Sequence, residues 1–147
     1  AVTAAIPIQF IAALVGTSFF AVLFGVPRKY YFAAGIVGVL GWMVYILMSR
    51  YTPMGDFGST FLAATMVAFL SRYAAIKLKC PSTVFLICGI FPLIPGAGVF
   101  WSAYYIASTQ LESAIMMGLS SVKLTLAIVL GIIVAANVFH SSNWQSK

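Results

Sequence analysis

The feature that most constrains this chain is an apolar run, residues 83–107, that prolines and glycines interrupt. Pro92, Pro95, Gly96 and Gly98 fall within seven positions. Proline removes a backbone N–H and clashes with the preceding helical turn, and glycine adds backbone freedom that a helix has to suppress. Because the run is long enough to cross a bilayer, it predicts a membrane helix that is broken near mid-membrane, at residues 92–98.

A break at that depth has two interpretations. Irregular backbone survives inside a membrane only where protein or a water-filled cavity covers it. Transporters place substrates at such breaks, because half-helix ends offer unpaired N–H and C=O groups. The structural alternative is a proline kink that neighbouring helices stabilise, and the break by itself leaves both interpretations open.

The composition defines the class of protein. The chain is 63% hydrophobic and 7% charged, whereas a soluble domain has about 25% charged residues. This predicts an all-α integral membrane protein, and the net charge of +6 does not indicate nucleic-acid binding, because the basic residues lie at the ends of apolar runs. We expect a single membrane domain, residues 1–147, with five transmembrane helices at about 6–26, 31–49, 57–76, 83–107 and 114–139.

Few side chains could support acid–base or metal chemistry. Cys80 and Cys88 lie in a loop and an apolar run, and Asp56, Glu112 and His140 are the only carboxylates and imidazole. No two of the last three share a helix face, so the pattern predicts no enzyme, no metal site and no cofactor. Asp56 instead suits an N-terminal cap of the third span.

Small residues form a face on the second span. Gly35, Gly38 and Gly41 recur every three residues, which allows close helix packing in lipid. The third span has a similar alanine face at positions 63, 64 and 68. Gln9 in the first span is expected to bond to backbone or to face a neighbouring helix rather than to bind a ligand.

Lys123 lies inside the predicted fifth span. Counted from Ala114, it is about 13–14 Å along the helix, which approaches the middle of a hydrocarbon layer of about 30 Å. An ionisable residue at that depth marks a functional site. Alternatively, the helix starts near Ser120, Lys123 is interfacial and residues 113–119 lie along the surface. Ser120 and Ser121 could share a ligand with the lysine or bond to backbone.

Arg72 is the other cation within a predicted span. It lies five residues before Lys77, about 7–8 Å deeper along a helix, where a long side chain can snorkel or face an inward anion site. The candidate substrate-binding residues are therefore those of the break and these polar groups, namely Pro92, Pro95, Gly96, Gly98, Ser120, Ser121, Lys123 and Arg72.

The distribution of cations predicts the topology. One side holds Arg28, Lys29, Arg72, Lys77, Lys79 and Lys147, and the other holds Arg50, with Lys123 left aside. Since the positive side is cytoplasmic, we expect the N-terminus outside and the C-terminus in the cytoplasm. An odd number of spans also suggests one half of an inverted-repeat transporter, which pairs with a second unit of opposite topology.

The motifs resemble a known family. The chain has FGVPR at 24–28, GVLGW at 38–42, PSTVF at 81–85 and GIFPLIPG at 89–96. These are similar to the threonine/serine exporter (ThrE-type) family, and most closely to its separate small subunit (YjjB-like). The resemblance covers nearly the whole chain, and its most specific part is the Pro-Leu-x-Pro-Gly element with the upstream Pro-x-x-Val-Phe.

The resemblance implies a function and a partner. Family members export small hydrophilic metabolites, threonine and serine in a fused form and succinate in a split form, using the proton gradient. The split form pairs this subunit with a larger YjjP-like membrane subunit as a hetero-oligomer in the bacterial inner membrane. The alternatives are a structural or assembly subunit, or a passive channel component, with the substrate site in the partner.

Overall fold

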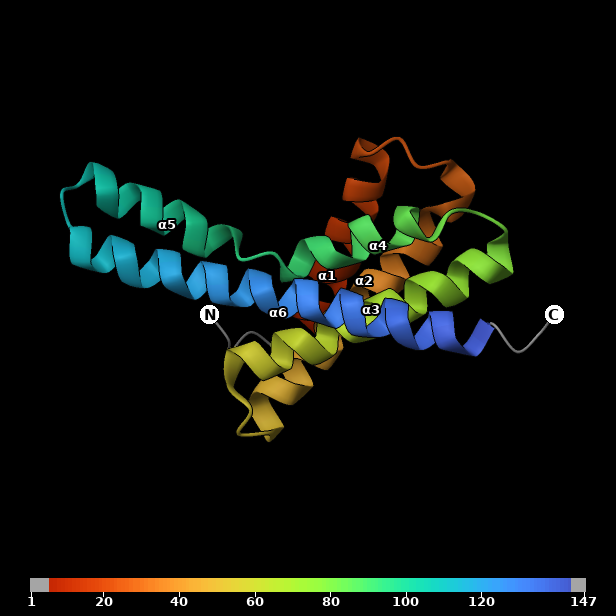
Figure 1. Cartoon of the computed structure of the whole chain (residues 1–147). Helices are drawn as coiled ribbons and strands as arrows, with labels where there is room; N and C mark the ends of the chain where they lie inside the picture. Colours follow the sequence, from red (N-terminus) through yellow and green to blue (C-terminus); the bar gives the residue numbers. More distant parts are fainter. Residues whose placement is uncertain (1–5, 144–147) are drawn as a thin grey trace.

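The computed structural model describes residues 6–143, and these residues form helices and short connections with no strand. Figure 1 shows their arrangement. The elements follow in the order α1 (Ile6–Leu23), η1 (Arg28–Tyr30), α2 (Tyr31–Tyr51), α3 (Gly55–Leu78), α4 (Ser82–Ile90), η2 (Phe91–Leu93), α5 (Gly96–Ala107) and α6 (Leu111–Asn143), where η marks a 3-10 turn.

Within the described residues, four helices are long and apolar enough to cross a membrane. They are α1, α2 together with η1, α3 and α6, and the pair formed by α4–η2 and α5 gives a fifth span if it is counted as one. The two parts of that pair meet at a bend of 52°. This confirms the predicted all-α membrane protein with a broken fourth span, while the inverted repeat stays a prediction.

The glycine face of α2 packs as predicted. A Cβ added at Gly38 would collide with the side chain of Thr17 on α1, and one added at Gly41 would collide with Val67 on α3. Both glycines are buried. Because Gly38 and Gly41 have no side chains, α1 and α3 can pack closely against α2. Small residues stabilise helix packing in lipid in this way.

The alanine face of α3 packs against α6. A Cβ at Gly131 of α6 would lie 2.8 Å from the carbonyl oxygen of Phe61 and 3.0 Å from the Cβ of Ala64. The Thr65 hydroxyl also donates a hydrogen bond to the Gly131 carbonyl oxygen at 3.4 Å. The C-terminal half of α6 is thus part of the bundle, which confirms the predicted role of the small residues of the third span.

The broken span enters the bundle and turns away from it. Gly89, near the end of α4, packs so closely between Val37 and Val67 that an added Cβ would lie 2.8 Å from each side chain. Phe91, the next residue but one, stacks on Phe20 of α1 with ring centroids 4.0 Å apart. The helix resumes at Gly96, so the irregular segment is residues 91–95 and ends slightly earlier than predicted.

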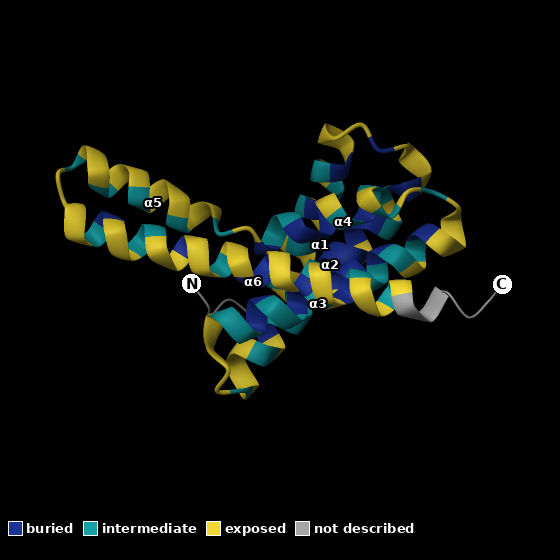
Figure 2. Cartoon of the chain, in the orientation of Figure 1, coloured by how far each residue is buried: buried dark blue, intermediate teal, exposed yellow. Residues whose placement is uncertain are grey.

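Helix α6 begins earlier than predicted and runs without interruption. Its 33 residues start at Leu111, so residues 113–119 do not form a separate surface segment, while the depth of Lys123 in the membrane stays a prediction. Helix α5 packs against the N-terminal part of α6, and the two project together from the bundle (Figure 1). We call α5 and residues 111–122 of α6 the arm, and Figure 2 shows that its surface is mostly exposed.

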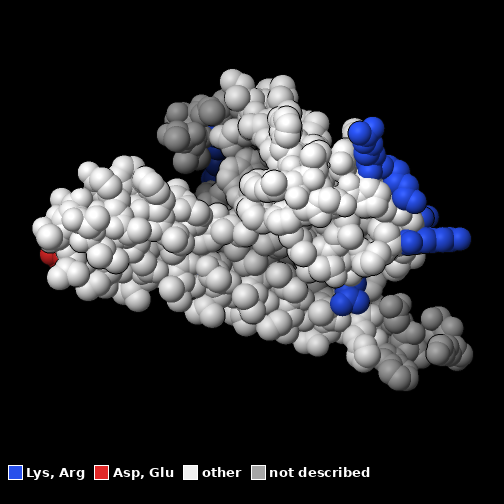
Figure 3. Space-filling model, turned by 90° about the horizontal axis from the view of Figure 1, so that it is seen from above, with Lys and Arg blue, Asp and Glu red and all other residues white. Residues whose placement is uncertain are grey.

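Cations gather at one end of the molecule, away from the tip of the arm (Figure 3). The Tyr30 hydroxyl donates a hydrogen bond to the Leu78 carbonyl oxygen at 3.4 Å, which joins the start of α2 to the end of α3. This end carries the exposed residues Arg28, Lys29, Lys77 and Lys79. Arg50 lies at the opposite end of α2, and Lys147 lies outside the described residues.

The packing of α2 leads to a prediction for a single added methyl group. We expect Gly38→Ala to lower the free energy of unfolding by about 1–3 kcal/mol, because the new Cβ overpacks against Thr17. The matched control is Gly16→Ala, since a Cβ at Gly16 meets no atom within 4 Å. Thermal unfolding of the purified chain in detergent measures both. Equal midpoints for the two variants would contradict the close packing of α1 on α2.

Candidate functional site

The break lines a cavity of about 340 Å³, which we call the break cavity. Its walls come from η2, the start of α5, α2, α3 and the middle of α6. Six of the eight residues predicted from the sequence meet there, namely Pro92, Pro95, Gly96, Gly98, Ser120 and Ser121. The structure therefore brings the serines of α6 to the break, although they lie more than twenty positions away in the sequence.

A close contact between α5 and α6 forms this side of the cavity. A Cβ at Gly98 would collide with the Ser121 hydroxyl, whereas one at Gly96 would meet no atom within 4 Å. The Ser121 hydroxyl donates a hydrogen bond to the Met117 carbonyl oxygen at 2.9 Å. Ser121 thus bonds to backbone, one of the two roles expected for it, while Gly96 leaves open space at the cavity wall.

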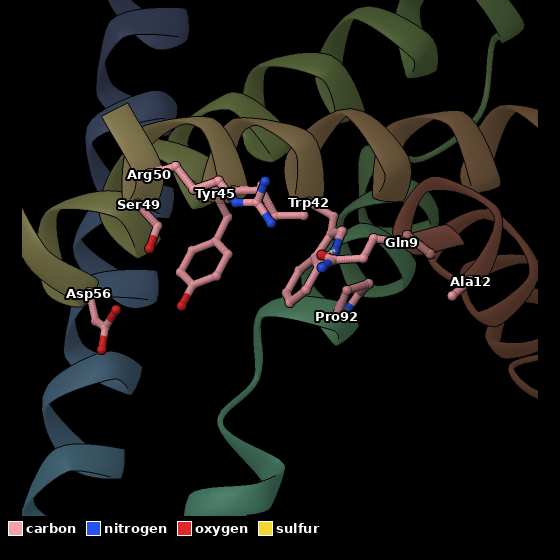
Figure 4. A pocket seen from close by; sticks show the side chains of 10 residues that line it. Gln9, Ala12, Trp42, Tyr45, Ser49, Arg50, Asp56 and Pro92 are labelled. Atoms are coloured by element: carbon pink, nitrogen blue, oxygen red, sulfur yellow. Dashed lines mark hydrogen bonds between the residues drawn. The ribbon is translucent and has the colours of Figure 1, made fainter. Parts of the chain in front are cut away.

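A second and larger cavity, about 630 Å³, adjoins the first. We call it the charged pocket, because it holds both a cation and a carboxylate (Figure 4). It shares Trp42, Tyr45 and Pro92 with the break cavity. Its lining is Gln9, Ala12, Ala13, Trp42, Tyr45, Ile46, Ser49, Arg50, Asp56 and Pro92.

Aromatic side chains of α2 separate the two cavities. Trp42 and Tyr45 stack with ring centroids 5.2 Å apart, and the Trp42 Nε1 donates a hydrogen bond to the Gln9 Oε1 at 3.2 Å. Gln9 therefore faces a neighbouring helix, as predicted, and it also lines the pocket. The Tyr45 hydroxyl points toward the Asp56 carboxylate and interacts with it (Figure 4).

The position of Asp56 differs from the prediction. The N-cap of α3 is Met54, and no side chain bonds to the helix terminus there. Asp56 lies in the first turn of α3 instead, and its carboxylate faces the charged pocket. Gly55 has a φ of +73°, a conformation that glycine adopts readily. The turn it helps to form brings Asp56 back to the same pocket as Arg50 at the end of α2.

Sequence reasoning missed the charged pocket because its charged residues lie at helix ends. Arg50 was counted for topology alone and Asp56 as a cap. The sequence feature that could have revealed the pocket is the short turn at 52–54, which separates Arg50 from Asp56. A turn this short places both side chains at the same end of two neighbouring helices.

Arg72 and Lys123 lie away from both cavities just described. The Arg72 guanidinium is 5.6 Å from the centroid of the Phe139 ring, where it makes a cation–π contact. It lines a smaller hollow with Cys80 and Ser82. Lys123 is exposed on α6, about 18 Å from the start of that helix. A substrate-binding role for these two cations stays a prediction.

The fold and the two cavities define a class of protein. A multi-pass helical membrane protein with a broken span, an apolar pocket and opposite charges at its rim is arranged like a unit of a small-molecule transporter. The chain belongs to the threonine/serine exporter family, since the family described as "Threonine/Serine exporter, ThrE" matches residues 9–138. This is a family of exporters rather than of enzymes.

A curated relative has the same description. The chain is 28% identical over 94 residues to a threonine/serine exporter of Corynebacterium glutamicum. The matched segment covers 64% of this chain and 18% of that relative, so the chain spans less than a fifth of the relative's length. No solved structure matches the chain.

The contact between Gly98 and Ser121 gives a prediction for the break cavity. We expect Gly98→Ala to destabilise the arm, because the added Cβ collides with the Ser121 hydroxyl, whereas Gly96→Ala extends into open space. Overpacking of this kind costs about 1–3 kcal/mol. Hydrogen exchange of α5 amides in detergent measures the difference, with faster exchange in Gly98→Ala alone. Unchanged exchange in that variant would show that α5 does not pack as described.

Proposed function

We propose that this chain is the small subunit of a secondary transporter that exports threonine, serine and similar zwitterionic amino acids. The observation that supports this substrate class best is the presence of both the Arg50 guanidinium and the Asp56 carboxylate in the lining of the charged pocket. Membership in the threonine/serine exporter family and the printed name of the curated relative point to the same class.

The charges of the pocket fit a zwitterion. The Arg50 guanidinium offers a planar set of donors that suits a carboxylate, and the Asp56 carboxylate accepts hydrogen bonds from an ammonium group. The hydroxyl of Tyr45 and the amide of Gln9 supply neutral partners for a hydroxylated side chain. The pocket, about 630 Å³, is large enough for a small amino acid.

A dicarboxylate such as succinate is the second candidate substrate. Arg50 would hold one of its carboxylates, but the second would lie in a pocket that already contains the Asp56 carboxylate. The second carboxylate of the substrate and the Asp56 carboxylate would repel each other, and this repulsion is stronger where water is excluded. The charge pattern therefore favours a zwitterion over a dianion.

The break provides the next part of the route. The first-turn N–H groups of α5, at Ala97 and Gly98, have no carbonyl in their own helix to bond to. They lie at the break cavity, where a helix N-terminus favours a carboxylate. Because Trp42, Tyr45 and Pro92 line both cavities, movement of these side chains would let a substrate carboxylate pass from one cavity to the other.

We place the complex in the bacterial inner membrane. The cationic end would face the cytoplasm by the positive-inside rule, with the N-terminus outside, so the charged pocket would open outward. Export would be coupled to the proton gradient, and Asp56 is the carboxylate in this pocket that could exchange a proton. A larger YjjP-like subunit would supply the opposing half, and rocking of one half against the other would give alternating access.

Efflux from preloaded vesicles tests the function. We expect labelled threonine and serine to leave vesicles that contain this chain with the larger subunit, faster with a proton gradient than without it. Vesicles with either chain alone serve as controls and should release the label only by leakage. Efflux from the larger subunit alone would reduce this chain to a structural role, and efflux that ignores the gradient would indicate a passive channel.

The same assay decides which charges serve the substrate. Arg50→Gln and Asp56→Asn each remove a charge-assisted hydrogen bond worth about 1.5–3 kcal/mol, so we expect threonine efflux at low concentration to fall about tenfold or more. Lys123→Gln is the matched control, since Lys123 is exposed away from the pocket. Loss of efflux in Lys123→Gln with activity retained in Arg50→Gln would move the site to α6.

A further inference from the structure

The arm leaves an unusually large apolar surface uncovered. Helix α5 contains no buried residue, and it packs mainly against α6. Phe100 is 62% exposed, Ile106 60%, Met116 68% and Leu119 65%. Among residues 96–122 the only charged side chain is that of Glu112, so neither face of the arm resembles a surface in contact with water.

Helix α6 is longer than the hydrocarbon layer is thick. The apolar part of α6, Leu111–His140, has 30 residues and is therefore about 45 Å long. To stay within a hydrocarbon layer of about 30 Å, a straight helix of this length would have to tilt by about 50°. Membrane helices tilt by about 0–40°. At an ordinary tilt, one or both ends of this segment would extend beyond the hydrocarbon layer into the interfacial region.

The break at the base of the arm has backbone that must be kept away from lipid. Ile94, Gly96 and Ala97, at and just after the break, are exposed on this chain. Irregular backbone at membrane depth is not tolerated against lipid, and it occurs only where protein covers it or where it lines a water-filled cavity. The exposed side of the break therefore requires either a covering protein segment or a water-filled cavity, and a docked segment would meet this requirement by completing the wall of the break cavity.

The arm offers a groove for such a segment. A hollow of about 480 Å³ runs between α5 and α6. Its floor includes the small residues Ser102, Ala103 and Gly118, with apolar walls at Val99 and Val122. Small residues let a neighbouring helix approach closely in a membrane, so the groove fits an apolar helix.

We propose that the groove of the arm and the adjoining exposed side of the break are the docking surface for a helix of the larger membrane subunit. This inference rests on the proposed function, because it assigns that exporter's partner to a surface. The docked helix covers the apolar groove and closes the open side of the break cavity, so that each subunit contributes part of the cavity wall.

The length of the curated relative favours a larger partner subunit over a second copy of this chain as the occupant of the groove. The chain matches only 18% of that exporter's length, so most of the relative's polypeptide lies outside the matched segment.

Co-purification of the larger subunit with the tagged chain tests the surface without relying on transport. Ala103→Trp fills the groove from an exposed position, and we expect it to reduce co-purification at least tenfold. The matched control is Met116→Trp. Met116 lies two residues before Gly118 and therefore about 200° around α6, on the face opposite the groove, so this variant should keep the partner. Equal recovery of the partner with both variants would overturn the proposal.

A cross-linking experiment identifies the occupant and does not depend on tolerance of tryptophan. The chain with Ala103→Cys, Cys80→Ser and Cys88→Ala is labelled with a thiol-reactive benzophenone, which on irradiation inserts into nearby C–H bonds, in membranes that contain both subunits. A cross-link to the larger subunit supports the proposal, whereas a cross-link only between copies of this chain, or none, overturns it.

Arg50→Gln separates docking from function, because this variant should still bind the larger subunit but lose efflux. If the subunits dock through the arm without transporting threonine or serine, the proposed function alone fails.

Discussion

Backbone polar groups inside a bilayer have no water to bond to, and the arrangement of this protein depends on how that constraint is met at residues 91–95. Helix α4 ends in a closely packed part of the bundle, where Gly89 fits between Val37 and Val67. The Phe91 ring then holds the turn against α1. One side of the break is thereby packed, and the other side lines a cavity. A structural kink and a substrate site are therefore not exclusive here, because the same segment serves as both wall and opening.

Close packing of α2 positions the polar groups of the pocket. Because Gly38 and Gly41 carry no side chain, α1 and α3 approach α2 from two sides. That approach lets Gln9 of α1 reach the Trp42 indole and places the first turn of α3 beside Tyr45. A helix pair separated by an ordinary side chain would be spaced too widely for these contacts. The glycine face thus determines the shape of the pocket as well as the stability of the bundle.

Much of the fold could be predicted from local sequence, and the charged pocket could not. The break, the glycine face and the apolar spans depend on residues that are close in the chain, so their patterns are visible directly. The charged pocket depends on a turn that returns Asp56 to Arg50, and on Trp42 and Tyr45, which an apolar helix pattern treats as lipid-facing. Helix α6 begins at Leu111, a few residues before the predicted span of about 114–139. Glu112 lies in its first turn, where a carboxylate is favoured by the helix dipole.

The positions of Arg50 and Asp56 suggest a physical reason why this chain would need a partner subunit. Arg50 and Asp56 are exposed at one end of the bundle, so a substrate held there remains in contact with water and its charges are partly screened. The break cavity lies farther along the same route, behind Trp42 and Tyr45, and one side of its backbone is open on this chain. In the proposed transport cycle, a zwitterion that advances into this cavity would leave water only when that side is closed. Closure by a second subunit would therefore both exclude water and strengthen the interactions with the break, which is the condition for moving a polar solute through an apolar layer.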